Sequence, residues 1–142
     1  MPPPEGEPIG LQLVRTSRAV SRAFDEALGA AGGSLPVWLI LVSLKSGRYG
    51  TQRELAKSVG VEGPTLTHHL RRLERDGLIV RSRDPDNLRV QRVEITETGT
   101  AMFFELLRVV RAFDRRLRDG LPQAEVTVLG DLLEQLRRNV QG

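Results

Sequence analysis

Apolar side chains recur along this chain at intervals of three and four residues, which is the spacing of one face of an α-helix. The pattern predicts a first helix from Ile9 to about Ala31 and two last helices, from about Glu97 to Arg118 and from about Gln123 to Val140. Between them, Ser34 is an N-cap candidate for a helix that contains the run VWLILVSLKSG. This run is apolar nearly all round, which is typical of a helix buried at the centre of a domain.

Two shorter helices are predicted in the middle of the chain. The stretch TQRELAKSVGV begins with a capping box, in which Thr51 and Glu54 each accept the backbone amide of the other. It ends at Gly60, a residue that adopts a positive φ without strain. The stretch GPTLTHHLRRLER then forms a helix from about Gly63 to Arg75. Two short helices joined by a tight glycine turn indicate a helix-turn-helix, whose second helix enters the major groove of DNA.

The period of the pattern changes after this second short helix. The segment LIVRSRDPDNLRVQRVEIT is rich in β-branched residues around the turn-forming DPDN, which predicts two short strands and a turn, and Thr96 caps the next helix. The predicted fold class is therefore mainly α with a small β-hairpin, as a winged helix-turn-helix over residues 34–96 between terminal helices over residues 9–33 and 97–142. Residues 1–8 are expected to form a flexible, proline-rich arm before a single domain over residues 9–142.

The helix from Gly63 to Arg75 is amphipathic. At about 100° per residue, Leu66, Leu70 and Leu73 form one apolar stripe that must be buried. The opposite face and its flanks carry threonines, His68 and arginines, whose groups suit hydrogen bonds to base edges and phosphates. This face is either a DNA-reading surface or an ordinary solvated charged face, and the neighbouring helix-turn-helix pattern favours DNA.

The hairpin carries arginines of its own, which suit contact with the DNA backbone or the minor groove. The alternative is a solubilising hairpin whose edge is charged to prevent strand pairing. Pro64 fits the first helical turn, where its missing amide proton costs nothing. The residues predicted to contact DNA are Thr51, Pro64, Thr65, Thr67, His68, Arg71, Arg72, Arg83 and Arg89.

The formal charge is only +3, but the basic excess is local, because seven arginines and four acids fall between Arg71 and Arg92. The absence of cysteine excludes disulfides and thiolate metal sites. A metal site at His68 and His69 is not expected either, because adjacent helical residues point about 100° apart and zinc-binding pairs on a helix prefer a spacing of three or four. No cofactor is expected.

Other classes of protein find little support in the chain. It has no glycine-rich phosphate loop, serine elbow or cysteine nucleophile, so an enzyme is not expected. It has no apolar run of about 18 residues and no secretory signal at its start, so neither a membrane partner nor export is expected. A winged helix used only for contacts with other proteins remains the alternative to DNA binding.

The run TQRELAKSVGVEGPTLTHHLRRLERDGLIVRSRDPDNLRVQRVEITETG resembles the core of the MarR family of bacterial transcriptional regulators, and GPTLTHHL is similar to its SlyA-like branch. The resemblance implies a cytoplasmic homodimer, a repressor in the leading hypothesis, that binds palindromic DNA and responds to small aromatic or phenolic ligands. Three residues depart from the family pattern. His68 stands where arginine is common, Asn87 where aspartate is usual, and Leu88 where a second basic residue is common.

The terminal helices carry more apolar side chains than one small winged helix can cover, which indicates a dimer seam, although packing on their own chain is the alternative. The seam residues predicted are Leu11, Val14, Phe104, Phe113, Leu132 and Leu136. For a ligand cleft, the resemblance suggests the neighbourhood of Trp38 in the central helix, with Arg15 as a partner for an acidic group. A core role for Trp38 and a surface role for Arg15 are the alternatives.

Overall fold

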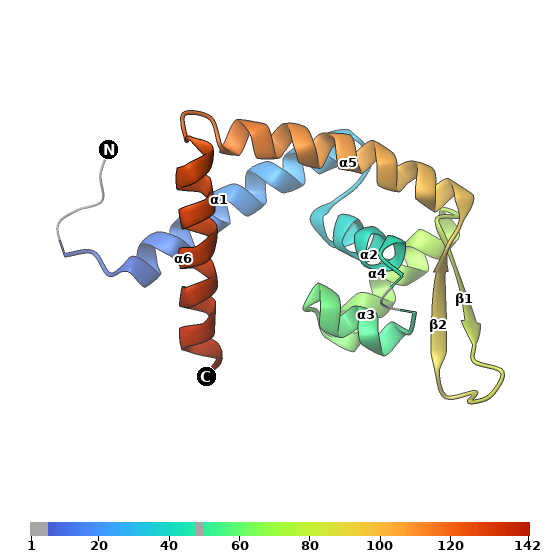
Figure 1. The fold of residues 1–142 in the computed structure, drawn as a ribbon. Helices are drawn as coiled ribbons and strands as arrows, with labels where there is room; N and C mark the ends of the chain where they lie inside the picture. Colours follow the sequence, from blue (N-terminus) through green and yellow to red (C-terminus); the bar gives the residue numbers. More distant parts are fainter. Residues whose placement is uncertain (1–5, 48–49) are drawn as a thin grey trace. The chain divides into compact units, whose positions relative to one another are not determined.

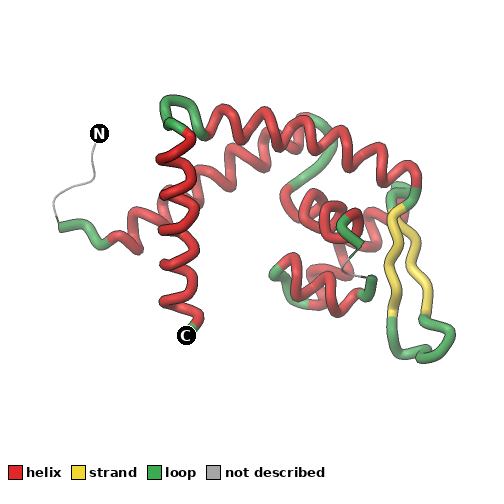
Figure 2. Tube along the Cα trace, viewed as in Figure 1, coloured by secondary structure: helices red, strands yellow, loops and turns green. Residues whose placement is uncertain are grey.

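The computed structural model of the protein describes residues 6–47 and 50–142. Figures 1 and 2 show its elements in chain order: α1 (Ile9–Ala30), α2 (Leu35–Lys45), α3 (Gln52–Val59), α4 (Gly63–Arg75), β1 (Ile79–Arg83), β2 (Gln91–Ile95), α5 (Glu97–Leu117) and α6 (Gln123–Gln141). This order and the mainly α fold class with one hairpin confirm the prediction. Of the arm predicted over residues 1–8, the first five residues lie outside the described part of the chain.

The chain divides into two compact units, residues 1–110 and residues 111–142, so that α5 begins in the first unit and ends in the second. The first unit holds α1 to α4, the hairpin and most of α5. Figure 1 shows α3 and α4 gathered beside α2, with the two strands next to them. The residues predicted to contact DNA all belong to this unit.

Helix α2 lies at the centre of the first unit, as its apolar run predicts. It begins at Ser34, whose side chain accepts the amide of Val37 at 3.3 Å. One side of α2 contributes Ile40 and Leu44 to a cluster with α3, α4 and the hairpin. Its other side contributes Trp38 and Leu41 to a cluster with α1 and α5. Because its two sides pack in different clusters, α2 belongs to both hydrophobic cores of the first unit.

The helix-turn-helix forms from α3 and α4, and its local signals are those of the sequence. Thr51 and Glu54 form the predicted capping box, with Thr51 Oγ1 accepting from Glu54 N at 3.2 Å and Glu54 Oε1 accepting from Thr51 N at 3.1 Å. The Thr51 hydroxyl also donates to Glu54 Oε1 at 2.9 Å, and this bond is the largest cause of a lowered pKa at Glu54. Gly60 ends α3 with a φ of 78°, which a residue with a Cβ rarely adopts.

The hairpin is antiparallel, with a register that pairs Ile79 with Ile95 and Arg83 with Gln91. It is also attached to the start of α3, because Val93 N donates to Gly50 O at 3.0 Å and Thr51 pairs with Arg92 as an isolated bridge. The predicted wing is therefore held by backbone hydrogen bonds to the helix-turn-helix beside it.

Helix α5 starts where the hairpin ends. Thr96 Oγ1 accepts the amide of Gly99 at 3.0 Å, which confirms the predicted cap, and its hydroxyl donates to Gly77 O at 2.6 Å. Gly99 is buried in this first turn, where a Cβ would lie 2.0 Å from Leu78 O and 2.8 Å from Ile95 Cγ1. The junction between hairpin and helix therefore has no room for any side chain at this position.

The second unit contains the end of α5 and all of α6, and none of the side chains of α6 is fully buried. Arg118, the residue after α5, forms an ion pair with Asp114 at 3.2 Å.

Among the described helices, none by itself is long and apolar enough to cross a membrane. Only α1 and α2 taken together, across a bend of 77°, reach that length and hydropathy.

The packing at Gly99 leads to a stability prediction with an internal control. Gly99→Ala should lower the free energy of unfolding by about 1–3 kcal/mol, because the methyl group would meet the Leu78 carbonyl, which belongs to the backbone. Gly29→Ala, in α1, should leave stability unchanged or raise it by up to about 1 kcal/mol, because no atom lies within 4 Å of the added Cβ. Urea unfolding followed by circular dichroism measures both. Equal stability of the two variants would contradict the close packing at Gly99.

Candidate nucleic-acid interface

Helix α4 buries one stripe and exposes the rest. Leu66, Leu70 and Leu73 are at most 2% exposed, as the periodicity predicts. The exposed residues of the helix include Thr65, His68, Arg71, Arg72 and Arg75. The apolar stripe therefore fixes the orientation of α4 on the core, and this orientation turns a basic face outward.

The first turn of α4 is open to a ligand. Pro64 lies in it, exposed, and the N-cap residue Glu62 makes no capping hydrogen bond through its side chain. Unpaired first-turn amides and the positive end of the helix dipole favour an anion, such as a phosphate, at this position. The predicted contact residues Pro64 and Thr65 lie together at this end of the helix.

The three predicted threonines have different environments. Thr65 is exposed, whereas Thr67 is half-buried, with its hydroxyl donating to Gly63 O at 3.0 Å and accepting from Gln52 Nε2 at 2.8 Å. Thr51 caps α3 and is half-buried beside the hairpin. Of the three, only Thr65 has a hydroxyl without a partner among the described residues. Gln52 was not among the predicted site residues, because its partner lies fifteen residues further along the chain.

The two histidines occupy separate positions on α4. His68 is exposed and His69 is half-buried, and their rings meet edge to face with centroids 5.8 Å apart. Burial lowers the pKa of His69, and the neighbouring charges of His68 and Arg72 lower it further. Burial therefore favours the neutral form of His69. The histidine on the exposed face of α4 is His68. The described residues contain no cluster of three or more metal-binding side chains.

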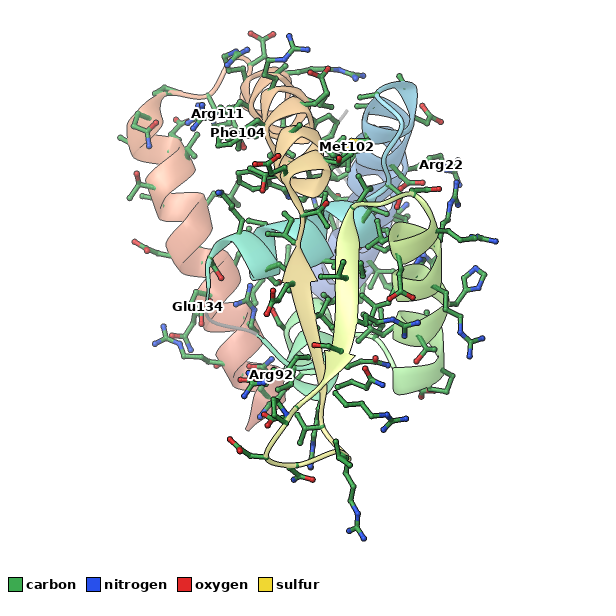
Figure 3. All side chains as sticks on the ribbon, turned by 90° about the vertical axis from the view of Figure 1, so that its right-hand side faces the viewer. Arg22, Arg92, Met102, Phe104, Arg111 and Glu134 are labelled. Atoms are coloured by element: carbon green, nitrogen blue, oxygen red, sulfur yellow. The ribbon has the colours of Figure 1, made fainter. Side chains whose placement is uncertain are left out.

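The start of the turn in the wing is held by a charged pair that the sequence analysis did not single out. Asp84 is only 8% exposed, and its carboxylate accepts Arg92 Nε at 2.8 Å and pairs with Arg92 Nη2 at 2.6 Å. It also accepts the backbone amide of Asp86 at 2.8 Å. This amide, followed by the Arg92 side chain, lowers the pKa of Asp84. Arg92 lies beside the lower part of the hairpin in Figure 3.

The tip of the wing contains both predicted wing arginines. Arg83 Nη1 donates to Leu88 O at 2.7 Å, so this side chain is partly used to close the turn. Asn87 Oδ1 accepts the backbone amide of Arg89 at 3.2 Å, so the asparagine holds the main chain of Arg89 and not its guanidinium group. Arg89 is exposed, and its guanidinium has no partner in the described part of the chain. Arg89 is thus the wing arginine with its full set of donors available.

A basic hollow of about 460 Å³ lies between α4 and the hairpin. It is lined by Arg71, Glu74, Arg81, Ser82, Arg83 and Gln91. Glu74 pairs with Arg81 at 3.1 Å across the hollow, and Arg81 lowers the pKa of Glu74. This ion pair joins α4 to β1. The other two arginines of the lining, Arg71 and Arg83, give the hollow its positive charge.

The two residues predicted to bind a ligand are not brought together. Trp38 is 8% exposed and stacks on Phe103 with ring centroids 5.4 Å apart, so it is part of the core. Leu28 of α1 belongs to the same cluster as Trp38. Arg15 lies thirteen residues earlier on α1, about 20 Å away along a helix axis, and pairs with Glu7. The structure therefore supports the core reading of Trp38.

The residues predicted to form a dimer seam differ in exposure. Leu11, Val14, Phe104 and Leu132 are between 43% and 57% exposed, Leu136 is half-buried, and Phe113 is 8% exposed. Phe104 packs edge to face on Phe103, and it lies on the opposite side of α5 from Met102 (Figure 3). Phe113 is largely covered in the single chain, as the alternative of packing on its own chain would have it.

Comparisons with known proteins agree with this geometry. A family model described as MarR family matches residues 34–90. A MarR family transcriptional regulator from Rhodococcus sp. RHA1 is 28% identical, with a TM-score of 0.81 over 90% of this chain and 91% of that chain. CouR from Rhodococcus jostii RHA1, bound to p-coumaroyl-CoA, is 26% identical, with a TM-score of 0.78 over 92% of this chain and 91% of that chain. A mutant MarR from E. coli, complexed with operator DNA, is 25% identical, with a TM-score of 0.82 over 91% of this chain and 93% of that chain.

The matched region, residues 34–90, contains α2, the helix-turn-helix and the turn of the wing. The structural likeness extends over about nine tenths of the chain and so includes terminal helices as well. Residues 34–90 therefore match the MarR family in sequence, and about nine tenths of the chain is similar in fold to transcriptional regulators of that family.

Proposed function

We propose that this regulator is a repressor in the bacterial cytoplasm that binds a palindromic operator as a homodimer and is released by a small aromatic effector. The observation that carries the DNA-binding part is the exposed face of α4, which presents Thr65, His68, Arg71 and Arg72 along a helix whose N-terminus has no side-chain cap. Such a face supplies donors to base edges and phosphates together, which a surface used only for protein contacts does not need.

The wing supports the same proposal. Asp84 and Arg92 hold the start of its turn, and Asn87 Oδ1 holds the main chain at Arg89 by accepting its backbone amide. A long cationic side chain on a rigid tip loses little conformational entropy when it contacts a phosphate or enters the minor groove. Arg89 is therefore the wing residue that we assign to DNA, and Arg83 contributes its remaining donors beside it.

The homodimer proposal rests on exposed apolar side chains in each unit, described separately. In the first unit, Ile9, Leu11, Leu13 and Val14 of α1 are 37% to 62% exposed. In the second, α6 exposes Val128, Leu129, Leu132 and Leu133 while burying none of its side chains fully. Apolar surface on this scale favours burial of these side chains against a second copy of the chain. A twofold dimer would place its two α4 helices about 34 Å apart, which is one turn of DNA.

The effector proposal rests on a relative. CouR, which is 26% identical over 92% of this chain, was solved with p-coumaroyl-CoA bound. An aromatic acid or its CoA thioester is therefore the class of molecule that we propose for this chain. Trp38, the only tryptophan, stacks on Phe103 in the core that joins α1, α2 and α5, so it is placed to report a change there by its fluorescence.

Removal of the tip arginine tests DNA binding. Arg89→Ala should weaken binding to a duplex selected from host genomic fragments by about tenfold and lower the dependence on log salt by about one unit, because one phosphate-type contact is lost. Arg108→Ala is the matched control, since it removes the same charge from an exposed site on α5. Fluorescence anisotropy at several salt concentrations measures both. Equal affinity of the two variants would refute the role of the wing, and failure of the wild type to bind any duplex would favour the protein-interaction alternative.

A carboxylate on the apolar face of α6 tests the dimer. Leu132→Asp should convert a dimer to a monomer in sedimentation velocity, because burying a charge in an apolar seam is costly. Thr127→Asp adds the same group about 140° away around the helix, where the surface is polar, and should remain a dimer. A wild-type monomer, or a Leu132→Asp variant that is still dimeric at micromolar concentration, would exclude this seam.

Titration tests the effector. A panel of phenolic acids and their CoA thioesters, including p-coumaroyl-CoA, should contain a member that changes Trp38 fluorescence and lowers affinity for the selected duplex at the same concentration. Linkage requires both effects to share one midpoint when a single site couples to DNA binding. If no compound in the panel alters either signal, the effector proposal fails while the DNA-binding proposal stands.

A further inference from the structure

Thr65 and Thr67 lie two positions apart on the recognition helix, and both were predicted to contact DNA through similar chemistry. Their surroundings differ. Thr65 is exposed and its hydroxyl has no partner among the described residues, whereas the hydroxyl of Thr67 lies 3.0 Å from Gly63 O and 2.8 Å from Gln52 Nε2. The two side chains therefore offer different groups to any ligand that approaches α4.

The hydroxyl of Thr67 has only one proton, and this proton is donated to the Gly63 carbonyl. Phosphate oxygens, guanine O6 and N7, and thymine O4 are all acceptors, so none of them can bond a hydroxyl whose proton is already used. One lone pair of the oxygen is also occupied, by the amide of Gln52. The second lone pair could accept only from adenine N6 or cytosine N4, so the group of Thr67 that has no hydrogen-bonding partner to satisfy is its methyl.

The side chain of Gln52 keeps the hydroxyl engaged in either orientation of its amide. With Nε2 toward Thr67, the hydroxyl accepts from the amide and donates to Gly63 O. In this orientation Gln52 Oε1 is buried and has no partner in the described part of the chain. With the amide rotated, Oε1 would take the proton of Thr67 itself. In both cases the proton of Thr67 stays inside the helix-turn-helix.

We propose that Thr67 contacts DNA through its methyl group, that Gln52 is the positioning residue that turns this methyl outward, and that Thr65 supplies the hydroxyl contact. The partner of the methyl is the C5-methyl of a thymine, the apolar feature that the major groove displays. This inference rests on the proposed DNA-binding function and names the chemistry of one contact within it. It also makes Gln52, on α3, a determinant of specificity without a base contact of its own.

The same substitution at the two threonines separates their roles. Thr67→Val removes the hydroxyl and its bond to Gln52 but keeps a methyl on Cβ, so it should weaken the affinity for the selected duplex by about twofold. Thr65→Val should weaken it about fivefold, because it removes a hydrogen bond to DNA. Thr67→Ser keeps the hydroxyl and loses the methyl, and should weaken binding about fourfold. Thermal unfolding of each variant shows whether it is folded at the temperature of the binding measurement.

Uracil in place of single thymines of the duplex identifies the partner of the methyl. At one position in each half-site, this change should weaken binding by the wild type about fourfold and leave binding by Thr67→Ser unchanged, because the two substitutions remove the same contact. Gln52→Leu should reduce the preference for thymine over uracil at that position while the salt dependence of binding stays the same. A residue with a merely structural role would lower affinity for both duplexes equally.

Two results would overturn the inference. One is a loss of affinity in Thr67→Val that matches that in Thr65→Val, which would make the Thr67 hydroxyl a DNA contact. The other is wild-type binding that no uracil substitution weakens. Failure of the wild type to bind any duplex is distinguishable from both, because it appears before any variant is compared and removes the DNA-binding proposal itself.

Discussion

The burial of α2 on two sides is the constraint on which the first unit depends. A helix that is apolar nearly all round cannot lie at a surface, so it needs neighbours in several directions. Ile40 and Leu44 meet the helix-turn-helix and the hairpin, while Trp38 and Leu41 meet α1 and α5. Val37, Ile95 and Met102 pack against both clusters, so the two cores are continuous through shared side chains.

Polar side chains in the interface divide into those that build it and those that remain available to DNA. Asp84 and Arg92 hold the wing, Glu74 and Arg81 join it to the recognition helix, and the bond from Gln52 to Thr67 joins the two helices of the helix-turn-helix. Arg71, Arg72 and Arg75 are exposed on α4, and Arg89 is exposed on the turn of the wing. Glu74 and Asp84 thus fix geometry, while these arginines face solvent.

Local signals made the elements of this protein predictable. A capping box, a glycine with positive φ and a stripe of leucines at helical spacing each depend on residues within one or two turns of one another, so the sequence contains the whole interaction. The predicted buried stripe and the exposed basic face of α4 follow from the same periodicity. The local pattern left alternatives open where the contact is remote, as for Phe113, which is covered in the single chain, and for Trp38, which packs in the core.

The sequence by itself determined the order of helices and strands, the start and end of the helix-turn-helix, and the placing of basic residues on one face of α4. The tertiary structure decided which of these polar groups are still available for a ligand. In the sequence, Thr65 and Thr67 are two threonines on the same helix with nothing to separate their roles. Their hydroxyl groups differ in availability because Gln52 Nε2, fifteen residues before Thr67, lies 2.8 Å from the Thr67 hydroxyl. A hydrogen bond between separate elements depends on how those elements pack, and no local pattern records that distance.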